Sequence, residues 1–237
     1  MLKQNYEELK KRKKILSAVD VLGSFDFLTY TISLDSLNLN DIKILLDVKN
    51  ISQSEINYKY RKVFCLAVHE YTHFVDASST IWGINHLYLM NEAYLSSDSY
   101  KRDPEEFYKA KKFHTHITKI KYPKYYNVIG KVGNSFPWGA TPTMGLLFGA
   151  DGKLTDEGIV FMRFFTVSGN EIARTPISAV SILEASAMAN EIFAKVSFVN
   201  MLNREDLILA NKDLHDEVMS FLYNKELTEY SACVHML

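Results

Sequence analysis

Cysteine is scarce in this chain of 237 residues, and the two that occur, Cys65 and Cys233, lie far apart in the sequence. Two cysteines so placed form neither a disulfide framework nor a Cys-x-x-Cys metal site. The chain also lacks any run of about 18 apolar residues of the kind that spans a membrane. Its charged first residues are not followed by the apolar segment of a signal peptide. The sequence therefore predicts a soluble, cytoplasmic protein.

An excess of charge of one sign is absent too, because the chain has 27 Lys and Arg and 28 Asp and Glu, which gives a formal net charge of −1. This balance does not favour binding to nucleic acid or to an anionic membrane. A hydrophobic content of 47% is that of a globular rather than a disordered chain. No internal repeat, low-complexity segment or shift of composition marks a domain boundary. We expect a single domain over residues 1–237 that binds neither nucleic acid nor membrane.

The first elements of this domain are predicted to be strands followed by a helix. Phe25–Leu34 and Ile42–Val48 are rich in aromatic and β-branched residues, which is typical of strands. Ser52 is followed three residues later by Glu55, the spacing of a capping box. Apolar residues then recur at a period near 3.6, which predicts that this helix continues to about Ser78.

Helices dominate the rest of the chain. Thr80–Ser97, with a break at Gly83, and Pro104–Ile120 are expected to be helical. A long helix is expected from about 175 to 202, with Thr175 as N-cap and Pro176 at the first helical position. Glycine and proline crowd into residues 122–158, which predicts a long turn-rich segment that shapes or covers a cleft. We expect a strand over Ile159–Val167 and one or two helices over residues 204–237.

One predicted helix carries the sequence His69-Glu70-Tyr71-Thr72-His73. Positions i and i+4 share a helix face, so both imidazoles can reach one metal ion at about 2.0–2.1 Å. Glu70 lies about 100° further round the helix, where it can act on a water molecule held at the metal. Such an ion lowers the pKa of that water toward about 7, and Glu70 can accept its proton.

The two histidines could instead be core residues that are held by hydrogen bonds. For one histidine on an apolar face, that interpretation is the better one. Two histidines at i and i+4 with a glutamate between them are costly to bury unless they have a common partner. The pattern therefore favours a metal site, with zinc as the preferred ion.

The motif resembles the signature of the zincin superfamily of zinc metallopeptidases, over the motif helix and at most one further helix. The resemblance implies that His69 and His73 are zinc ligands and that Glu70 is the catalytic base. The longer metzincin pattern is absent, because Asp76 and Ser79 stand where it has glycine and histidine. A glutamate on a later helix, as in the gluzincin branch, is then expected as the third ligand.

Two glutamates compete for that role. Glu184 lies among small and apolar residues, where a carboxylate needs a partner or a metal. Glu92 follows His73 by 19 positions, and this spacing resembles that of gluzincins. Glu184 could otherwise be a core carboxylate paired with Arg163 or Arg174, and Glu92 could be an exposed helix residue. We favour Glu184 and keep Glu92 as the alternative.

Several further residues are candidates for supporting roles at the metal. Asp76 lies three positions after His73, where it could accept an imidazole N–H or simply end the helix. Glu191 could act in the same way or face water. His114 and His116 point apart on a helix and do not predict a second site. An oxyanion-stabilising donor is also needed, and the sequence does not rank the candidates His86, Arg174, Tyr230 and His235.

The fold class we expect is α+β, mostly helical and zincin-like, with a small N-terminal β-sheet packed on the motif helix. The sheet and motif helix fall within residues 20–100 or so, and the third-ligand helix within about 175–202. The resemblance implies a zinc-dependent peptidase that hydrolyses a protein or peptide, which could bind to the edge of Phe25–Leu34 by strand addition. A metal-stabilised binding or regulatory protein without turnover, and another metal-assisted hydrolase, remain alternatives.

Overall fold

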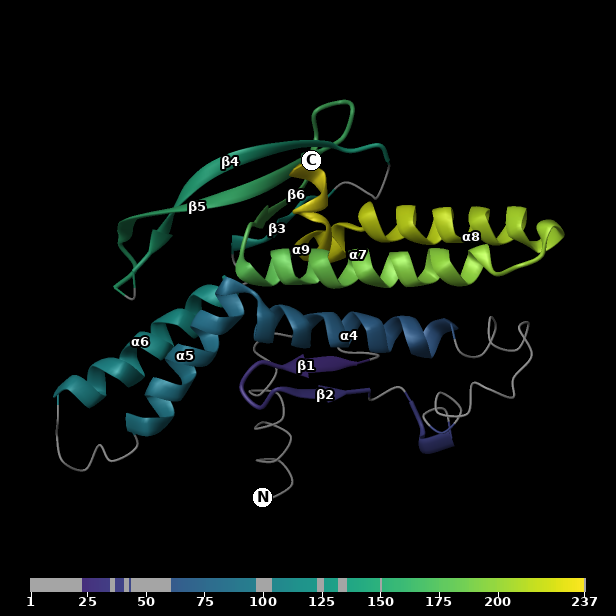
Figure 1. The fold of residues 1–237 in the computed structure, drawn as a ribbon. Helices are drawn as coiled ribbons and strands as arrows, with labels where there is room; N and C mark the ends of the chain where they lie inside the picture. The colour runs from purple at the N-terminus through teal and green to yellow at the C-terminus, as the bar shows by residue number, and fades with distance from the viewer. Residues whose placement is uncertain are drawn as a thin grey trace, which may run out of the picture. The chain divides into compact units, whose positions relative to one another are not determined.

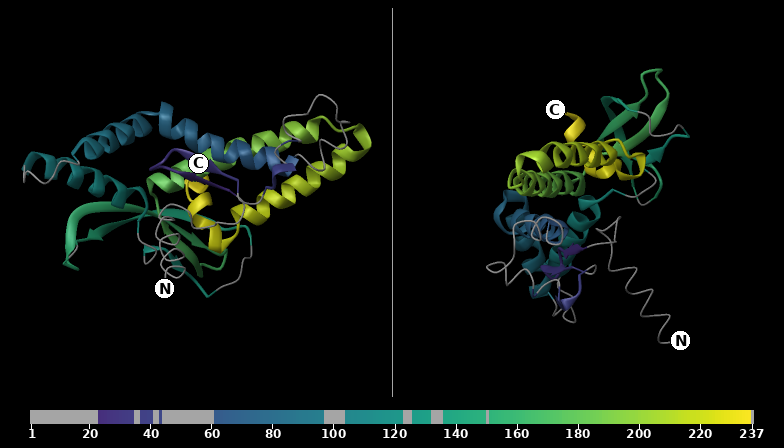
Figure 2. Two further views of the ribbon diagram at one scale, coloured as in Figure 1. Left: turned by 90° about the horizontal axis from the view of Figure 1, so that it is seen from below. Right: turned by 90° about the vertical axis from the view of Figure 1, so that its right-hand side faces the viewer.

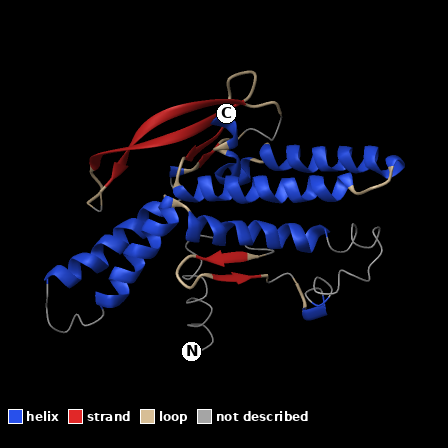
Figure 3. Ribbon diagram, in the orientation of Figure 1, coloured by secondary structure: helices blue, strands red, loops and turns tan. Residues whose placement is uncertain are grey.

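The computed structural model describes residues 23–34, 37–40, 43, 61–96, 104–122, 126–131, 136–149 and 151–236. The chain divides into two compact units, residues 1–117 and residues 118–237, although no change of composition marks this boundary. Each unit combines helices with a small sheet, so the fold is α+β and mostly helical, as the sequence predicts (Figure 3). None of the described helices is long and apolar enough to cross a membrane.

The first unit contains a hairpin of two short antiparallel strands, β1 (Ser24–Asp26) and β2 (Thr31–Ser33). The Asp26 carboxylate accepts a hydrogen bond from the backbone N–H of Leu28 at 2.9 Å, and Tyr30 has a positive φ of 55° that closes the turn. The predicted strand Phe25–Leu34 is therefore a hairpin rather than a single strand.

This hairpin packs on the motif helix α4 (Arg61–Ser79), which confirms the expected position of the N-terminal sheet (Figure 1). Phe25 of β1 contacts Phe74 of α4 edge to face, with ring centroids 6.3 Å apart. The predicted strand Ile42–Val48, apart from residue 43, lies outside the described residues. The capping box of Ser52 and Glu55 also lies outside them.

A sharp turn connects α4 to the next helix, α5 (Ile81–Leu95). Thr80 is its N-cap, and its hydroxyl accepts a hydrogen bond from the backbone N–H of Gly83 at 3.0 Å. A Cβ on Gly83 would lie only 2.3 Å from the carbonyl oxygen of Ala77, so glycine lets the two helices approach closely. The helix break predicted at Gly83 therefore occurs at Thr80, and Gly83 serves the packing.

The third helix of the first unit, α6 (Pro104–Ile120), has the bounds that the sequence predicts. Pro104 occupies the first helical position, where its missing N–H costs nothing. Glu105 and Glu106 follow in the first turn, where carboxylates interact favourably with the helix dipole. Residues next to the helix start thus provide the signal that defines it.

The second unit is built on a four-stranded antiparallel sheet with a long hairpin at one side (Figures 1 and 2). Within the segment predicted to be turn-rich, residues 122–158, residues 139–148 and 154–158 form long strands of this sheet, so the prediction of turns is corrected there. The predicted strand Ile159–Val167 is found, but it begins five residues earlier. In sheet order the strands are β3 (Val128–Ile129), β6 (Glu171–Pro176), β5 (Leu154–Phe165) and β4 (Gly139–Phe148).

The glycines of β4 do not interrupt the strand, because aromatic rings of β5 lie across them. Gly139 pairs with Phe165, and a Cβ on Gly139 would lie 2.1 Å from a carbon of the Phe165 ring. The ring thus covers backbone that glycine leaves bare, an arrangement that stabilises glycine in a strand. Composition alone suggested turns here, whereas cross-strand packing makes the segment a strand.

The predicted helix start at Thr175 and Pro176 is also wrong, because both residues end strand β6. Thr175 is fully buried, and its hydroxyl lies 2.6 Å from that of Thr228 and 3.0 Å from Asn127 Oδ1. The long helix α7 (Ala179–Asn200) begins instead at Ser178, which forms a capping box with Ser181.

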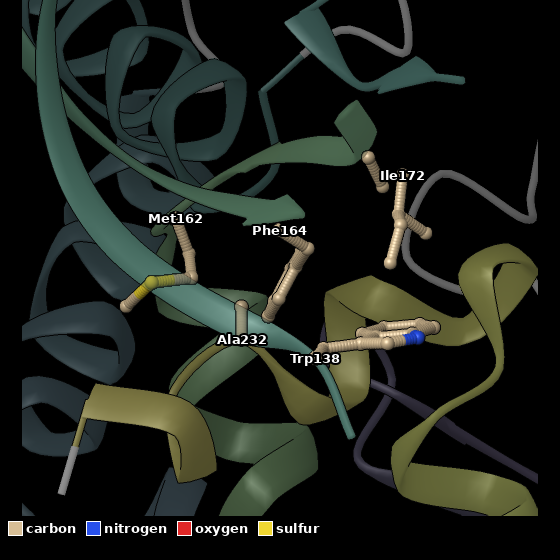
Figure 4. Packing of buried hydrophobic residues seen from close by; sticks show 6 residues of the cluster. Trp138, Met162, Phe164, Ile172 and Ala232 are labelled. Atoms are coloured by element: carbon tan, nitrogen blue, oxygen red, sulfur yellow. The ribbon is translucent and has the colours of Figure 1, made fainter. Parts of the chain in front are cut away.

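Helix α8 (Arg204–Leu222), capped by Asn203, runs back alongside α7 (Figure 2). The short helix α9 (Thr228–Ser231) and two 3₁₀ turns, η5 (Lys225–Leu227) and η6 (Val234–Met236), follow. The C-terminal turns pack on the sheet, where Ala232 joins Trp138 and Phe164 in the main apolar core of the unit (Figure 4). Met162, Ile172 and Ala173 complete this cluster.

Candidate metal centre

Helix α4 brings the three motif side chains to one buried place. His69, Glu70 and His73 are all buried, which is unusual for titratable groups on one helix. The two imidazole rings have centroids 5.0 Å apart and are nearly perpendicular, with an interplanar angle of 81°. The i, i+4 spacing places both rings on one face of the helix, where they can bind one ion.

The backbone at Gly23, just before β1, lies against the Glu70 side chain. A Cβ on Gly23 would lie 3.0 Å from Glu70 Oε1 and 3.1 Å from Glu70 Cγ. Glycine therefore leaves room for the Glu70 side chain, and a Cβ at this position would require its neighbours to shift by a few tenths of an ångström. The sequence gives no signal for this role of Gly23, because a single glycine ahead of a strand does not indicate which side chain it faces.

A second pair of histidines, His86 and His116, holds Phe27, whose ring lies beside that of His73. The Phe27 ring lies 6.2 Å from the His73 ring, centroid to centroid, and the Phe27 carbonyl oxygen lies 3.0 Å from His86 Nε2. Because a carbonyl only accepts, Nε2 of His86 carries the hydrogen and its Nδ1 accepts one from His116 Nε2 at 3.1 Å. His86 thus anchors Phe27 to α6.

Burial keeps this histidine pair neutral. Desolvation lowers the pKa of His86, although its hydrogen bond to the Phe27 backbone acts in the opposite direction. Desolvation, and then the proximity of His86, lower the pKa of His116. His86 is fully buried with both ring nitrogens engaged, so it is not free to stabilise an oxyanion.

Asp76, the predicted outer partner of the histidines, lies on α4 one turn after His73. Its Oδ2 is buried and has no hydrogen-bond partner among the described residues. A buried carboxylate oxygen without a donor is costly, so this position suits a nearby cation or an imidazole N–H. The role of Asp76 beside the histidines stays a prediction.

The alternative third ligand, Glu92, lies on α5 in the same unit. Its Oε2 is 3.9 Å from Nζ of Lys109 on α6. Among the described residues it belongs to no group of three acid, imidazole or thiol side chains close enough to hold a metal ion. Glu92 thus has a cationic neighbour of its own, which accounts for its charge without a metal.

The favoured third ligand, Glu184, lies on α7 in the second unit, on the second turn after the Ser178 cap. The sequence left open that an arginine pairs with it. Arg163 Nη2 instead lies 3.5 Å from Glu171, and the Arg174 guanidinium stacks 3.9 Å from the centre of the Phe161 ring. Both arginines therefore have other partners.

The other sequence candidates have contacts within their own unit. Glu191 Oε1 lies 2.7 Å from Lys195 Nζ, which explains its charge by an ion pair. His235 Nε2 lies 3.3 Å from the carbonyl oxygen of Leu222. The rings of Tyr230 and Phe221 pack edge to face with their centroids 5.8 Å apart. None of these contacts identifies an oxyanion-stabilising group.

No protein-family model, curated protein or solved structure matches this chain.

Proposed function

We propose that this protein is a zinc-dependent metallopeptidase in which His69, His73 and Glu184 hold the metal and Glu70 is the general base. The observation that carries the proposal is the proximity of three donors of the right kind. One ligand atom from each of His69, His73 and Glu184 lies within 4.8 Å of the other two. Since protein ligands stand about 2.0–2.2 Å from zinc, atoms this close can share one ion.

The donor set itself fits a catalytic zinc. Two histidines and one glutamate are among the sets of three protein ligands that leave a fourth position open for water or substrate. Asp76, one turn after His73 on α4, has a buried Oδ2 without a hydrogen-bond partner among the described residues. Outer carboxylates of this kind orient metal-binding imidazoles, so a cation would satisfy several groups at once.

A bound zinc ion would acidify water and polarise the carbonyl group of a peptide bond. The residues of this chain supply the rest of the chemistry. Glu70, held against the Gly23 backbone, can take a proton from the attacking water and pass it to the leaving amine. His69 and His73 would bind the ion through ring nitrogens, and both side chains are buried.

The rival hypothesis, a metal-stabilised binding or regulatory protein, shares the ligands but not the need for Glu70. The decisive experiment combines metal analysis with hydrolysis of an unfolded protein such as casein. We expect about one zinc per chain and an activity that chelators abolish. Glu70→Gln should retain the zinc and lose about 10²–10⁴-fold in turnover, the usual contribution of a general base.

The control is Glu157→Gln, which makes the same change at an exposed glutamate that pairs with Lys119. It should retain both zinc and activity. Zinc without any hydrolysis by the wild-type protein would favour the regulatory hypothesis. Absence of stoichiometric metal, with no thermal stabilisation by added zinc, would overturn the proposal as a whole.

A further inference from the structure

Helix α5 is apolar on two opposite faces. Its inner face, with Gly83, His86 and Leu89, is buried within the first unit. Its outer face exposes Ile81, Ile84, Tyr88 and Leu95, at 90%, 56%, 56% and 69% of their surfaces. A helix that is apolar all round is normally buried all round, so the outer face calls for a partner.

The spacing of the outer residues indicates what kind of partner fits. Positions 81, 84, 88, 91 and 95 alternate steps of three and four residues, which is the a/d repeat of a two-stranded coiled coil. His86 falls at the position opposite this seam, in agreement with its complete burial. The α5 seam, defined by Ile81, Ile84, Tyr88, Asn91 and Leu95, is therefore a regular helix-packing surface.

Charge on the α5 seam does not oppose self-association. The only acidic or basic residue of α5 apart from His86 is Glu92, and its carboxylate is directed toward Lys109 of α6. The seam itself holds four large apolar residues and one amide, Asn91. Two identical seams can therefore meet without like-charge repulsion.

We propose that α5 pairs with α5 of a second copy of this chain as a parallel, two-fold symmetric helix pair. In that arrangement each seam residue meets its own counterpart. Asn91 then faces Asn91 of the other copy, and the two amides satisfy each other because each has a donor and an acceptor. An antiparallel pair centred on Tyr88 would instead place Asn91 against Ile84. A single asparagine in such a seam sets register at some cost in affinity.

The size of the α5 seam suits a weak, reversible dimer. Its four apolar side chains expose on the order of 500 Å², given that large side chains carry roughly 150–250 Å² each. Two copies would bury on the order of 1,000 Å², the lower limit for a specific interface. We expect a dissociation constant in the micromolar range that changes little with salt, because no ion pair contributes.

Sedimentation equilibrium of the full chain over a range of concentrations tests this pairing. Ile84→Glu would place two carboxylates face to face in the α5 seam and should weaken association about 100-fold or more. The matched control is Ile208→Glu, the same change at an exposed isoleucine of α8, which should leave association unchanged. Circular dichroism should show that both variants stay folded, since neither side chain is buried.

Cross-linking tests the parallel register. Asn91→Cys should form a disulfide-linked dimer on mild oxidation, whereas Asn190→Cys, at an exposed position of α7, should not. A wild-type chain that stays monomeric at the highest concentration would overturn the proposal. Equal association of the two glutamate variants, or a dimer in which Asn91→Cys does not cross-link, would also overturn it. None of these results depends on metal or on peptidase activity.

Discussion

The choice between Glu184 and Glu92 can be tested by one matched pair of substitutions. Glu184→Gln and Glu92→Gln each replace a helical carboxylate by an amide of nearly the same shape. If Glu184 is the third ligand, only its replacement removes a negatively charged donor from the metal. Replacement of Glu92 removes instead a partner of Lys109 at 3.9 Å, and that change is the same with and without zinc.

The expected magnitude follows from the affinity of protein zinc sites. Four-ligand zinc sites are worth about 10–16 kcal/mol, or roughly 3 kcal/mol for each ligand. Losing one ligand should therefore weaken zinc binding about 100- to 1,000-fold. At a zinc concentration that still saturates both proteins, the stabilisation lost is the same 3 kcal/mol or so. For a chain of this size, that corresponds to about 6–12 °C in Tm.

The assay is thermal unfolding of metal-free protein with and without a slight excess of zinc. Wild type and Glu92→Gln should show the same rise in Tm, and Glu184→Gln should show a rise smaller by the amount above. If Glu92→Gln loses the zinc effect while Glu184→Gln keeps it, our assignment of the third ligand is wrong. If both variants keep it, neither glutamate binds the metal.

Three further predictions concern the first unit. Gly23→Ala should lower turnover about tenfold with zinc content unchanged, because its Cβ would lie 3.0 Å from Glu70 Oε1 and small displacements of a catalytic group are costly; unaltered turnover would mean that Gly23 does not position Glu70. Gly83→Ala should lower the free energy of unfolding by about 3 kcal/mol in a urea titration, since its Cβ would lie 2.3 Å from a backbone oxygen. Gly158→Ala is the control and should have little effect, because its nearest contact is the flexible end of Met144 at 3.4 Å. Burial lowers the pKa of His86 and of His116, so the unfolded chain binds more protons than the folded chain. The stability that the two neutral histidines contribute is therefore present above the unfolded pKa and is lost as pH falls from about 7 toward 5. Each histidine contributes at most about 1.4 kcal/mol per pH unit; urea unfolding of His86→Phe should show a shallower decline with falling pH than wild type, and equal slopes would refute this cause.

The helices that the sequence predicts well are those with local start signals. Pro104 with two glutamates fixes the start of α6, and Thr80 caps α5 through a hydrogen bond to a residue three positions on. Capping and propensity act over a single turn, so neighbours in the sequence are sufficient to define them. The common face of the two motif histidines is also predictable from the local sequence, because it follows from helix geometry alone.

The errors lie where distant contacts override local preference. Thr175 and Pro176 look like a helix start, yet Thr175 is paired with Met162 in the sheet and with Thr228 through their hydroxyl groups. The glycines of β4 suggested turns, yet rings of β5 cover them. Both outcomes depend on partners that local sequence does not reveal, since strand pairing is decided by residues far apart in the chain.

The sequence by itself determined that His69, Glu70 and His73 share a helix and that two of them can face one ion, because a helical repeat needs no information beyond residue spacing. Only the tertiary structure decided what surrounds them. It buries the three side chains, places the backbone of Gly23 against Glu70, and joins Phe27 to the His86 and His116 pair. These contacts join segments about 30 to 60 residues apart, and only the packing of the folded chain brings such segments together.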